Sequence, residues 1–175
     1  MELDESESAP SGESRNLEQR LLHEAISYLH PSPALTVPLD GTLQQAVGIM
    51  QTRHVGCVLV VDGGGLLKGI FTERDLLNRV AGKGLDWSKA PVADYMTADP
   101  ESLHADDAIV WALNLMHVGG YRHVPITDAA GKAVGVISVK DVVEFIVDLF
   151  PSQVLNLPPD PHRRPSSDWV GGGED

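Results

Sequence analysis

The sequence contains an internal repeat, because an offset of 66 residues aligns its middle part with itself without a gap. When residues 69–75 are placed over residues 135–141, a glycine, a hydroxyl residue, a basic residue and an aspartate recur in register. Upstream positions match at the same offset: Ala46, Met50, Val58, Val60, Asp62 and Gly65 correspond to Ala112, Met116, Val124, Ile126, Asp128 and Gly131. A repeated unit that cannot bury its own apolar face packs against its copy. We therefore expect a shared cleft between the copies, and functional residues in that cleft.

The charge balance and the single cysteine limit the class of protein. The chain has 25 acidic residues against 13 basic ones. Nucleic-acid affinity comes largely from clustered Lys and Arg, so DNA and RNA are not expected partners. Cys57 has no intrachain disulfide partner, and the N-terminus lacks the basic and apolar regions of a signal peptide. Apolar stretches are too short to cross a bilayer, so we expect no membrane partner and a cytoplasmic location.

The composition divides the chain into six segments. The two ends are rich in residues that bury little, namely Ser, Glu and Gly at the N-terminus and Pro and Gly at the C-terminus. We predict a disordered acidic tail over 1–16, a lead-in helix over 17–29, a first repeat over 30–82, a linker over 83–95, a second repeat over 96–149 and a flexible tail over 150–175.

Each repeat is predicted to run strand, helix, strand, strand, helix, which gives an α/β (α+β) fold. Apolar periodicity and Gly-containing turns place the elements. In the first repeat the strands are 35–37, 57–61 and 67–71, a helix carries Leu43, Val47 and Met50, and another begins at Glu73. In the second repeat the strands are at Leu103, 123–127 and 133–137, a helix carries Ile109, Leu113 and Met116, and the last helix runs to Phe150.

Three features make residues 30–149 resemble a pair of cystathionine-beta-synthase (CBS) domains, the regulatory unit often called a Bateman module. They are the Gly-apolar-x-Thr/Ser-x-x-Asp pattern ending at Asp75 and at Asp141, the run Tyr121 to Ile126 that begins a strand, and Tyr95-Met96-Thr97 at the start of the second repeat. The resemblance implies that the copies pack about a pseudo-twofold axis and that adenosine-containing ligands lie in the clefts between them. It also implies a homodimer, since many such modules pair into a flat disc.

Thr72 and Ser138 are each followed three residues later by an aspartate, Asp75 and Asp141. Each hydroxyl lies where a strand ends and a helix begins, and a helix N-terminus offers unpaired amides to phosphate. An ionised carboxylate only accepts hydrogen bonds and can take both hydrogens of a ribose cis-diol. The pattern therefore indicates a ribose site. It also fits a capping box, in which the aspartate accepts from the cap amide, and both roles can coexist.

The resemblance implies that each site draws on both repeats. The Ser138/Asp141 site would place adenine against Leu35, Val55 and Cys57, with His123 and Lys140 facing the phosphates. The Thr72/Asp75 site would use Arg74, Thr97, Ser102 and Tyr121, and Arg122 would serve either site or the rim. We expect the Ser138/Asp141 site to be the better occupied, because His123 and Lys140 supply positive charge. Solvated surface charge is the alternative interpretation of Arg74, Arg122 and Lys140.

Other positions carry weaker indications of function. The first repeat has His30-Pro31 near the place of Met96-Thr97, so the two sites need not be equivalent. Residues 104–107 include metal-ligand types, but Asp106 is better explained as the cap of the helix at Ile109. Cys57 lies in an apolar strand, which favours a buried thiol over a reactive one.

These observations predict a non-catalytic regulatory module that binds an adenine nucleotide between its repeats and requires no other cofactor. We expect a protein target to be regulated in trans, because the chain has no catalytic domain of its own. A nucleotide can act as the switch only if it binds one arrangement of the repeats more tightly than another. The alternative is a ligand-free scaffold that only dimerises. An enzyme is poorly supported, because the motifs contain no acid/base or nucleophile constellation.

Overall fold

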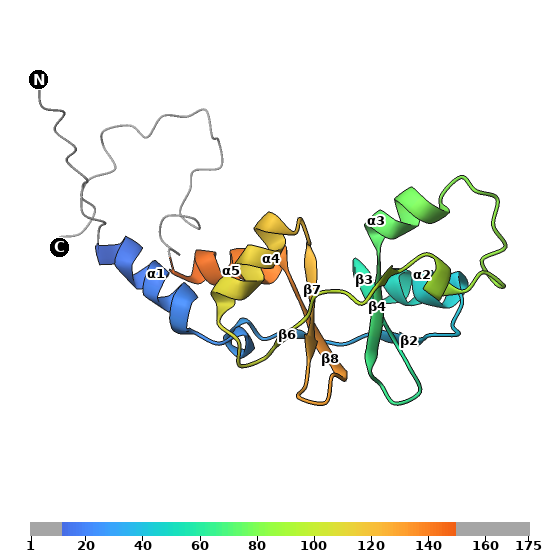
Figure 1. Ribbon diagram of the computed structural model, residues 1–175. Helices are drawn as coiled ribbons and strands as arrows, with labels where there is room; N and C mark the ends of the chain where they lie inside the picture. Colours follow the sequence, from blue (N-terminus) through green and yellow to red (C-terminus); the bar gives the residue numbers. More distant parts are fainter. Residues whose placement is uncertain (1–11, 150–175) are drawn as a thin grey trace, which may run out of the picture.

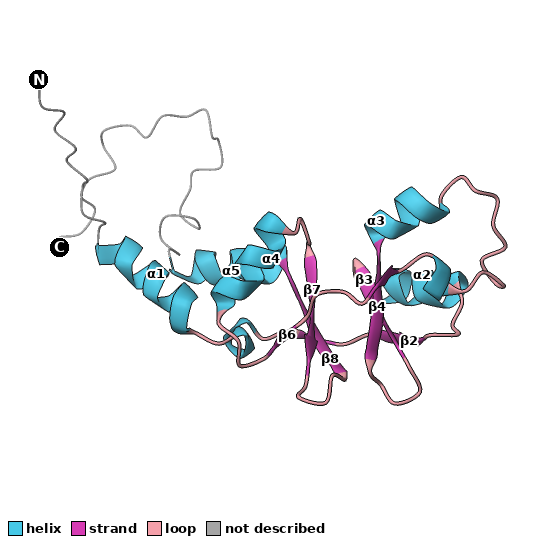
Figure 2. Cartoon of the chain, in the orientation of Figure 1, coloured by secondary structure: helices cyan, strands magenta, loops and turns pink. Residues whose placement is uncertain are grey.

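The computed structural model describes residues 12–149, so residues 1–11 of the predicted N-terminal tail and the whole of the predicted C-terminal tail, 150–175, lie outside the described residues. Two four-stranded sheets lie next to each other in the middle of the molecule, and helices cover their outer sides (Figures 1 and 2). The predicted α+β class, with two repeats of the same element order, is confirmed.

The lead-in segment consists of two short helices and not of the single helix predicted over 17–29. Helix α1 spans Gly12–His23, and a separate 3-10 helix, η1, spans Ile26–Leu29. Ala25 between them has an extended backbone and bridges Ala108, while the amide of Ile26 donates to the carbonyl of Asp107. These bonds to the second repeat replace the helical bonds, so the chain turns and buries Ile26 in the core.

The first repeat forms the sheet on the right of Figure 1. A capping box at Thr42 starts helix α2, in which Thr42 Oγ1 accepts from the amide of Gln45 and the Gln45 side chain accepts from the amide of Thr42. The elements are β2 (Thr36–Pro38), α2 (Leu43–Arg53), β3 (Cys57–Val61), β4 (Leu67–Thr72), α3 (Glu73–Asp75) and a π-helix, η2 (Leu76–Val80). The predicted stripe of Leu43, Val47 and Met50 is buried against this sheet.

The second repeat has the same order of elements, but its last helix, α5, is continuous, whereas the first repeat ends in α3 and η2. Its elements are β6 (Leu103–His104), α4 (Ile109–Val118), β7 (His123–Thr127), β8 (Ala133–Ser138) and α5 (Val139–Leu149). A short 3-10 helix, η3 (Val92–Asp94), lies in the segment between the repeats. Ile26 and Leu29 of η1 join the core of the second repeat, so the lead-in segment is part of this half of the molecule.

Each sheet borrows its outermost strand from the other half of the chain. Strand β1 (Ser32–Pro33) lies at the start of the first repeat but pairs with β8, and β5 (Thr97–Ala98) lies at the start of the second repeat but pairs with β4. Gly69 and Gly135 allow this exchange. A Cβ added at Gly69 would lie 2.2 Å from Sδ of Met96, and one at Gly135 would lie 3.1 Å from the carbonyl oxygen of Ser32. The close approach is thus made by Met96, the residue before β5, at Gly69 and by the backbone of β1 at Gly135.

The two repeats also meet at the tips of their hairpins. The amide of Leu67 donates to the carbonyl of Gly131, and the amide of Ala133 donates to the carbonyl of Gly65. Both glycines have positive φ, 83° and 78°, which a turn of this shape requires. Next to the tips, a small apolar cluster joins the halves through Cys57, Leu59 and Ile70 from the first repeat and Ala133 and Val136 from the second.

Candidate functional site

The cleft between the repeats holds two cavities, each beside one of the predicted Thr/Ser-x-x-Asp motifs. The larger, of about 440 Å³, is named here the Asp141 cavity. It contains all of the residues predicted for the Ser138/Asp141 site, and it adds several that were not predicted. Its walls are Ser32, Pro33, Leu35, His54, Val55, Gly56, Cys57, Glu73, Arg122, His123, Val136, Ser138, Val139, Lys140 and Asp141.

The smaller cavity, of about 130 Å³, is named the Asp75 cavity. It contains the predicted Thr72, Arg74, Asp75, Thr97 and Tyr121, but Ser102 does not line it. Pro100 and Glu101 lie there instead. The other lining residues are Gly56, Ile70, Glu73, Arg122, His123 and Pro125.

Four residues line both cavities and form a shared wall: Gly56, Glu73, Arg122 and His123. Gly56 immediately precedes β3 and lies beside the His123 ring, and a Cβ at this glycine would lie 2.9 Å from Nε2 of His123. A side chain at position 56 would therefore push the histidine out of place. Arg122 lines both cavities, as the prediction that it could serve either site requires.

The Asp141 carboxylate caps the helix that follows it. Its Oδ2 accepts from the amide of Ser138 at 2.6 Å and from Oγ of Ser138 at 2.8 Å. Among residues 12–149, Oδ1 accepts no hydrogen bond and forms no ion pair. The capping interaction thus uses one oxygen only. The other oxygen remains available at the cavity wall, so capping and ligand binding are compatible here.

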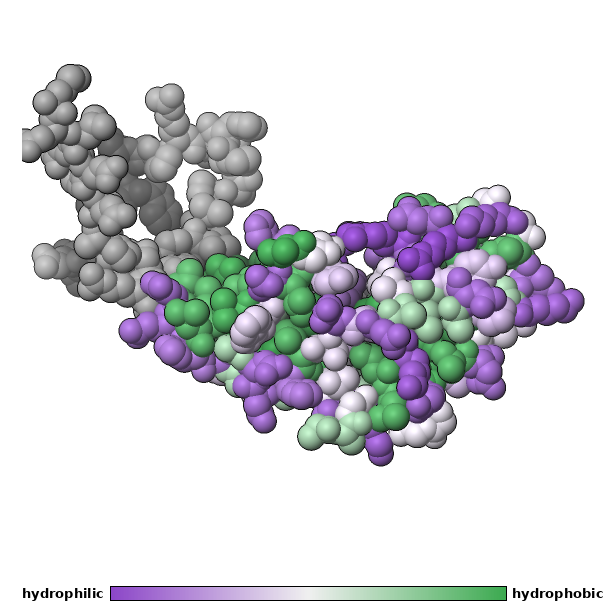
Figure 3. All heavy atoms as spheres, viewed as in Figure 1, coloured by the Kyte–Doolittle hydropathy of each residue, from purple (hydrophilic) through white to green (hydrophobic). Residues whose placement is uncertain are grey.

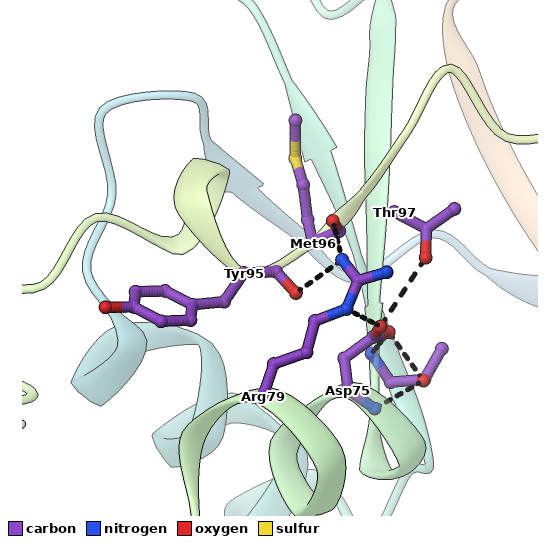
Figure 4. Close-up of polar contacts among 6 residues, drawn as sticks. Asp75, Arg79, Tyr95, Met96 and Thr97 are labelled. Carbon is purple, nitrogen blue, oxygen red and sulfur yellow. Dashed lines mark hydrogen bonds and ion pairs between the residues drawn. The ribbon is translucent and has the colours of Figure 1, made fainter. Parts of the chain in front are cut away.

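The Asp75 carboxylate has more partners, all drawn in Figure 4. Oδ2 accepts from the amide and Oγ1 of Thr72 at 3.0 and 2.7 Å. Oδ1 lies 3.4 Å from Nε of Arg79 and 3.5 Å from Oγ1 of Thr97. A carboxylate has about four acceptor positions, and four donors surround this one. Because Asp75 is buried, these contacts replace the water that it would otherwise bind.

The cationic side chains near the cavities are largely solvated. Nη1 of Arg74 donates to the carbonyl of Gly120 at 3.2 Å, and Nζ of Lys140 lies 3.2 Å from Glu144 with the lysine side chain 80% exposed. Both residues still line a cavity. The two interpretations, a cation of the ligand site and a solvated surface charge, are therefore compatible, because each side chain lines a cavity while its charged group lies in solvent.

Burial shifts the pKa of two residues of the walls. It lowers the pKa of His123, and Arg122 lowers it further, against the opposing effects of Glu73 and Asp141. His123 is therefore mostly neutral at pH 7 and does not supply the fixed positive charge expected from the sequence. Burial also raises the pKa of the Cys57 thiol to about 12, so Cys57 contributes an uncharged surface.

Ser32 is the most informative residue that sequence reasoning missed. Ser32, in β1, pairs with Val136. Thr97, in β5, pairs with Ile70, which corresponds to Val136 at the 66-residue offset. Ser32 and Thr97 therefore occupy equivalent positions beside the two cavities. The offset here is 65 and not 66, because residues 99–101 replace the two residues 34 and 35. Asp99 accommodates the additional residue with a φ of 44°. A search that allowed a one-residue gap after the first strand would have found this equivalence.

The weak metal indication at residues 104–107 finds no support. Within residues 12–149, no three His, Cys, Asp or Glu side chains are grouped as metal ligands. The predicted cap at Asp106 is wrong: Ala108 is the N-cap of α4, and Asp107 accepts from the amide of His104 at 2.7 Å. The side chain that stabilises the turn before α4 is therefore that of Asp107 and not that of Asp106.

Two tandem repeats that exchange an edge strand, with a cavity beside each strand-to-helix junction, define a paired regulatory fold. The profile of the CBS domain matches residues 26–82 and 92–148, so the chain belongs to the CBS-domain family. CBS-domain pairs are generally regulatory and non-catalytic. The chain is 32% identical over 143 residues to the CBS domain-containing protein CBSCBSPB1 of Arabidopsis thaliana, a match that covers 80% of this chain and 26% of the plant protein. The chain thus corresponds to about a quarter of that relative.

Solved structures show the same fold. The CBS-domain containing protein ATU1752 from Agrobacterium tumefaciens is 31% identical, with a TM-score of 0.61 over 69% of this chain and 95% of the other. CBSX2, solved in complex with AMP, is 22% identical, with a TM-score of 0.62 over 71% and 97%. No helix within residues 12–149 has the length and hydrophobicity needed to span a membrane.

Proposed function

We propose that this chain is a regulatory module that binds an adenosine nucleotide in the Asp141 cavity and transmits its occupancy to a partner protein. The observation that carries the proposal is the state of Asp141. This carboxylate lies at the wall of a cavity of about 440 Å³, and one of its oxygens has no bond to the described residues. A cavity of this volume is within the range that small-molecule ligands occupy.

The walls of the Asp141 cavity match the parts of a nucleotide. Leu35 and Val55 from the first repeat give an apolar surface for the base, and Asp141 from the second repeat gives an acceptor for the ribose diol. The start of α5, with Lys140 and Arg122, gives positive potential for phosphate. Because the ligand touches both repeats, it binds one relative arrangement more tightly than another, which is the requirement for signalling.

The similar structure of CBSX2, which was solved in complex with AMP, supports an adenosine ligand, since CBSX2 and this chain have the same fold. Isothermal calorimetry with AMP and with its 2′,3′-dideoxy analogue tests the proposal. We expect AMP to bind and the analogue to bind at least about tenfold more weakly, because a charge-assisted hydrogen bond contributes roughly 1.5–3 kcal/mol. Equal affinity for the two would contradict the role of Asp141. The absence of binding by AMP, ADP and ATP would favour the ligand-free scaffold.

We also propose that the module acts as a cytoplasmic homodimer and regulates its target in trans. Leu43, Val47, Met50 and Ile109 of helices α2 and α4 are buried in the cores and are not free to form a dimer interface. The apolar surface lies elsewhere on α4, where Trp111 is 59% and Val118 75% exposed. Figure 3 shows hydrophobic residues gathered on the side where α1, α4 and α5 lie. Twofold pairing is the commonest way to cover such a face.

A further inference from the structure

The two cavities differ in a residue that belongs to neither wall. Arg79 on the π-helix η2 approaches Asp75 with its Nε 3.4 Å from Oδ1. At the 66-residue offset its counterpart is Phe145, a buried core residue of α5. Asp141 therefore cannot receive a cation from the equivalent position. This substitution, arginine in one repeat and phenylalanine in the other, makes the two carboxylates chemically different.

From the π-helix η2, Arg79 also forms hydrogen bonds with the chain between the repeats. In a π-helix the hydrogen bonds span five residues, and the amide of Ala81 donates to the carbonyl of Leu76 in this way. Nη1 of Arg79 donates to the carbonyl of Tyr95 at 3.3 Å and to that of Met96 at 2.5 Å, as Figure 4 shows. These two carbonyls immediately precede β5. One guanidinium thus bridges Asp75 and the end of the linker.

We propose that Arg79 is an internal occupant of Asp75, which a ribose diol must displace, and that its displacement frees the linker end at Tyr95 and Met96. A diol has two O–H donors, which need two acceptor positions on one carboxylate. On Asp75 the acceptor positions are already occupied by Thr72, Thr97 and Arg79. The small volume of the Asp75 cavity, about 130 Å³, agrees with a closed state. The inference rests on the proposed function, since it assumes the same class of ligand.

Two consequences distinguish this arrangement from a simple structural ion pair. The protein binds its first AMP at the Asp141 cavity and a second one much more weakly. Binding of the second AMP loosens the segment before β5, because Arg79 loses its anchor at Asp75. The Asp75 cavity thus responds only to high nucleotide concentration, and its response is a release of the linker.

Calorimetric titration of AMP into the full chain and into Arg79→Met tests the proposal. We expect one tight site in the wild type, and in Arg79→Met a second site at least about tenfold tighter than the wild-type second site. That second site should require the diol and should disappear in the double variant Arg79→Met/Asp75→Asn. Arg53→Met removes an exposed arginine of α2 and serves as the matched control. Unchanged affinity at the Asp141 cavity shows that Arg79→Met is folded.

Each outcome decides between the proposals. Two equal sites in the wild type, or a single site in Arg79→Met, overturns the role of Arg79 and leaves the proposed function intact. Binding of AMP by Arg79→Met alone overturns the choice of the Asp141 cavity but supports the role of Arg79. No binding by either overturns both. Hydrogen exchange in the wild type needs no variant: faster exchange at residues 95–97 while the second AMP binds is expected, and unchanged or slower exchange contradicts the release.

Discussion

At the scale of single residues, the aspartates of the two motifs have the same sequence context and different surroundings. Asp141 uses one oxygen for its cap, whereas Asp75 meets four donors, one of them Arg79. The sequence predicted both hydroxyl–aspartate pairs and eight of the residues that line the Asp141 cavity. It could not predict the partner of Asp75, because an arginine four residues further along a helix is usual on a solvated surface.

Replacing the two aspartates separately should show this difference. We expect Asp141→Ala to weaken AMP binding by about 1.5–3 kcal/mol, because it removes a charged acceptor of the ribose. Asp75→Ala should leave the tight site within about twofold, and it serves as the matched control because both changes remove one cap. Calorimetry with AMP measures both affinities. A larger loss in Asp75→Ala would assign the tight site to the other cavity.

His123 should make the stability of the protein depend on pH. Its pKa in the folded protein is lower than the ordinary value of 6.5, mainly because of burial. The unfolded chain therefore takes up a proton before the folded one as the pH falls below 6.5, and the free energy of unfolding decreases down to the pKa of the folded state. Urea unfolding at pH 7.5 and 5.5 measures this. In His123→Gln the decrease should be smaller, and an identical decrease would assign it to other groups.

At the scale of elements, the longer strands and helices were predictable and the shortest were not. Strand β3 was predicted with its observed ends, Cys57–Val61, because an apolar run between turn signals is a strong pattern. Strands β1 and β5 have two residues each, and β1 contains Pro33, so no periodicity could reveal them. Their pairing depends on glycines in another part of the sequence. The π-helix η2 was also missed, since its residues have ordinary helical preferences.

The exchanged strand β5 should be sensitive to a methyl group at Gly69. We expect Gly69→Ala to lower the free energy of unfolding by about 1 kcal/mol, because the added Cβ would overlap the end of the flexible Met96 side chain, which must move away. Gly48→Ala is the control. Its Cβ would meet nothing within 4 Å, and alanine in helix α2 should add about 0.5–1 kcal/mol. Denaturant unfolding of both variants gives the comparison, which fails if Gly69→Ala is neutral.

At the scale of the whole molecule, the exposed face of α4 should determine the oligomeric state. We expect light scattering to give twice the chain mass of 18.8 kDa at micromolar concentration. Trp111→Glu should yield the monomer, because it places a charge in an interface that excludes water. Val134→Glu changes an exposed valine of strand β8 and should leave the dimer intact. A wild-type monomer, with or without AMP, would exclude the dimer.

The exchange of edge strands also has a consequence for the order in which the chain folds. Strand β1 pairs with Val136 and Gly135, which lie more than 100 residues further along the chain. During synthesis the sheet that contains β1 can be completed only after β8 has left the ribosome, more than 100 residues after β1. Contacts between such distant residues slow folding, because a long loop must close first. We therefore expect the sheet of the second repeat to be completed in a late step, after the sheet of the first repeat, whose strands all lie within residues 36–98.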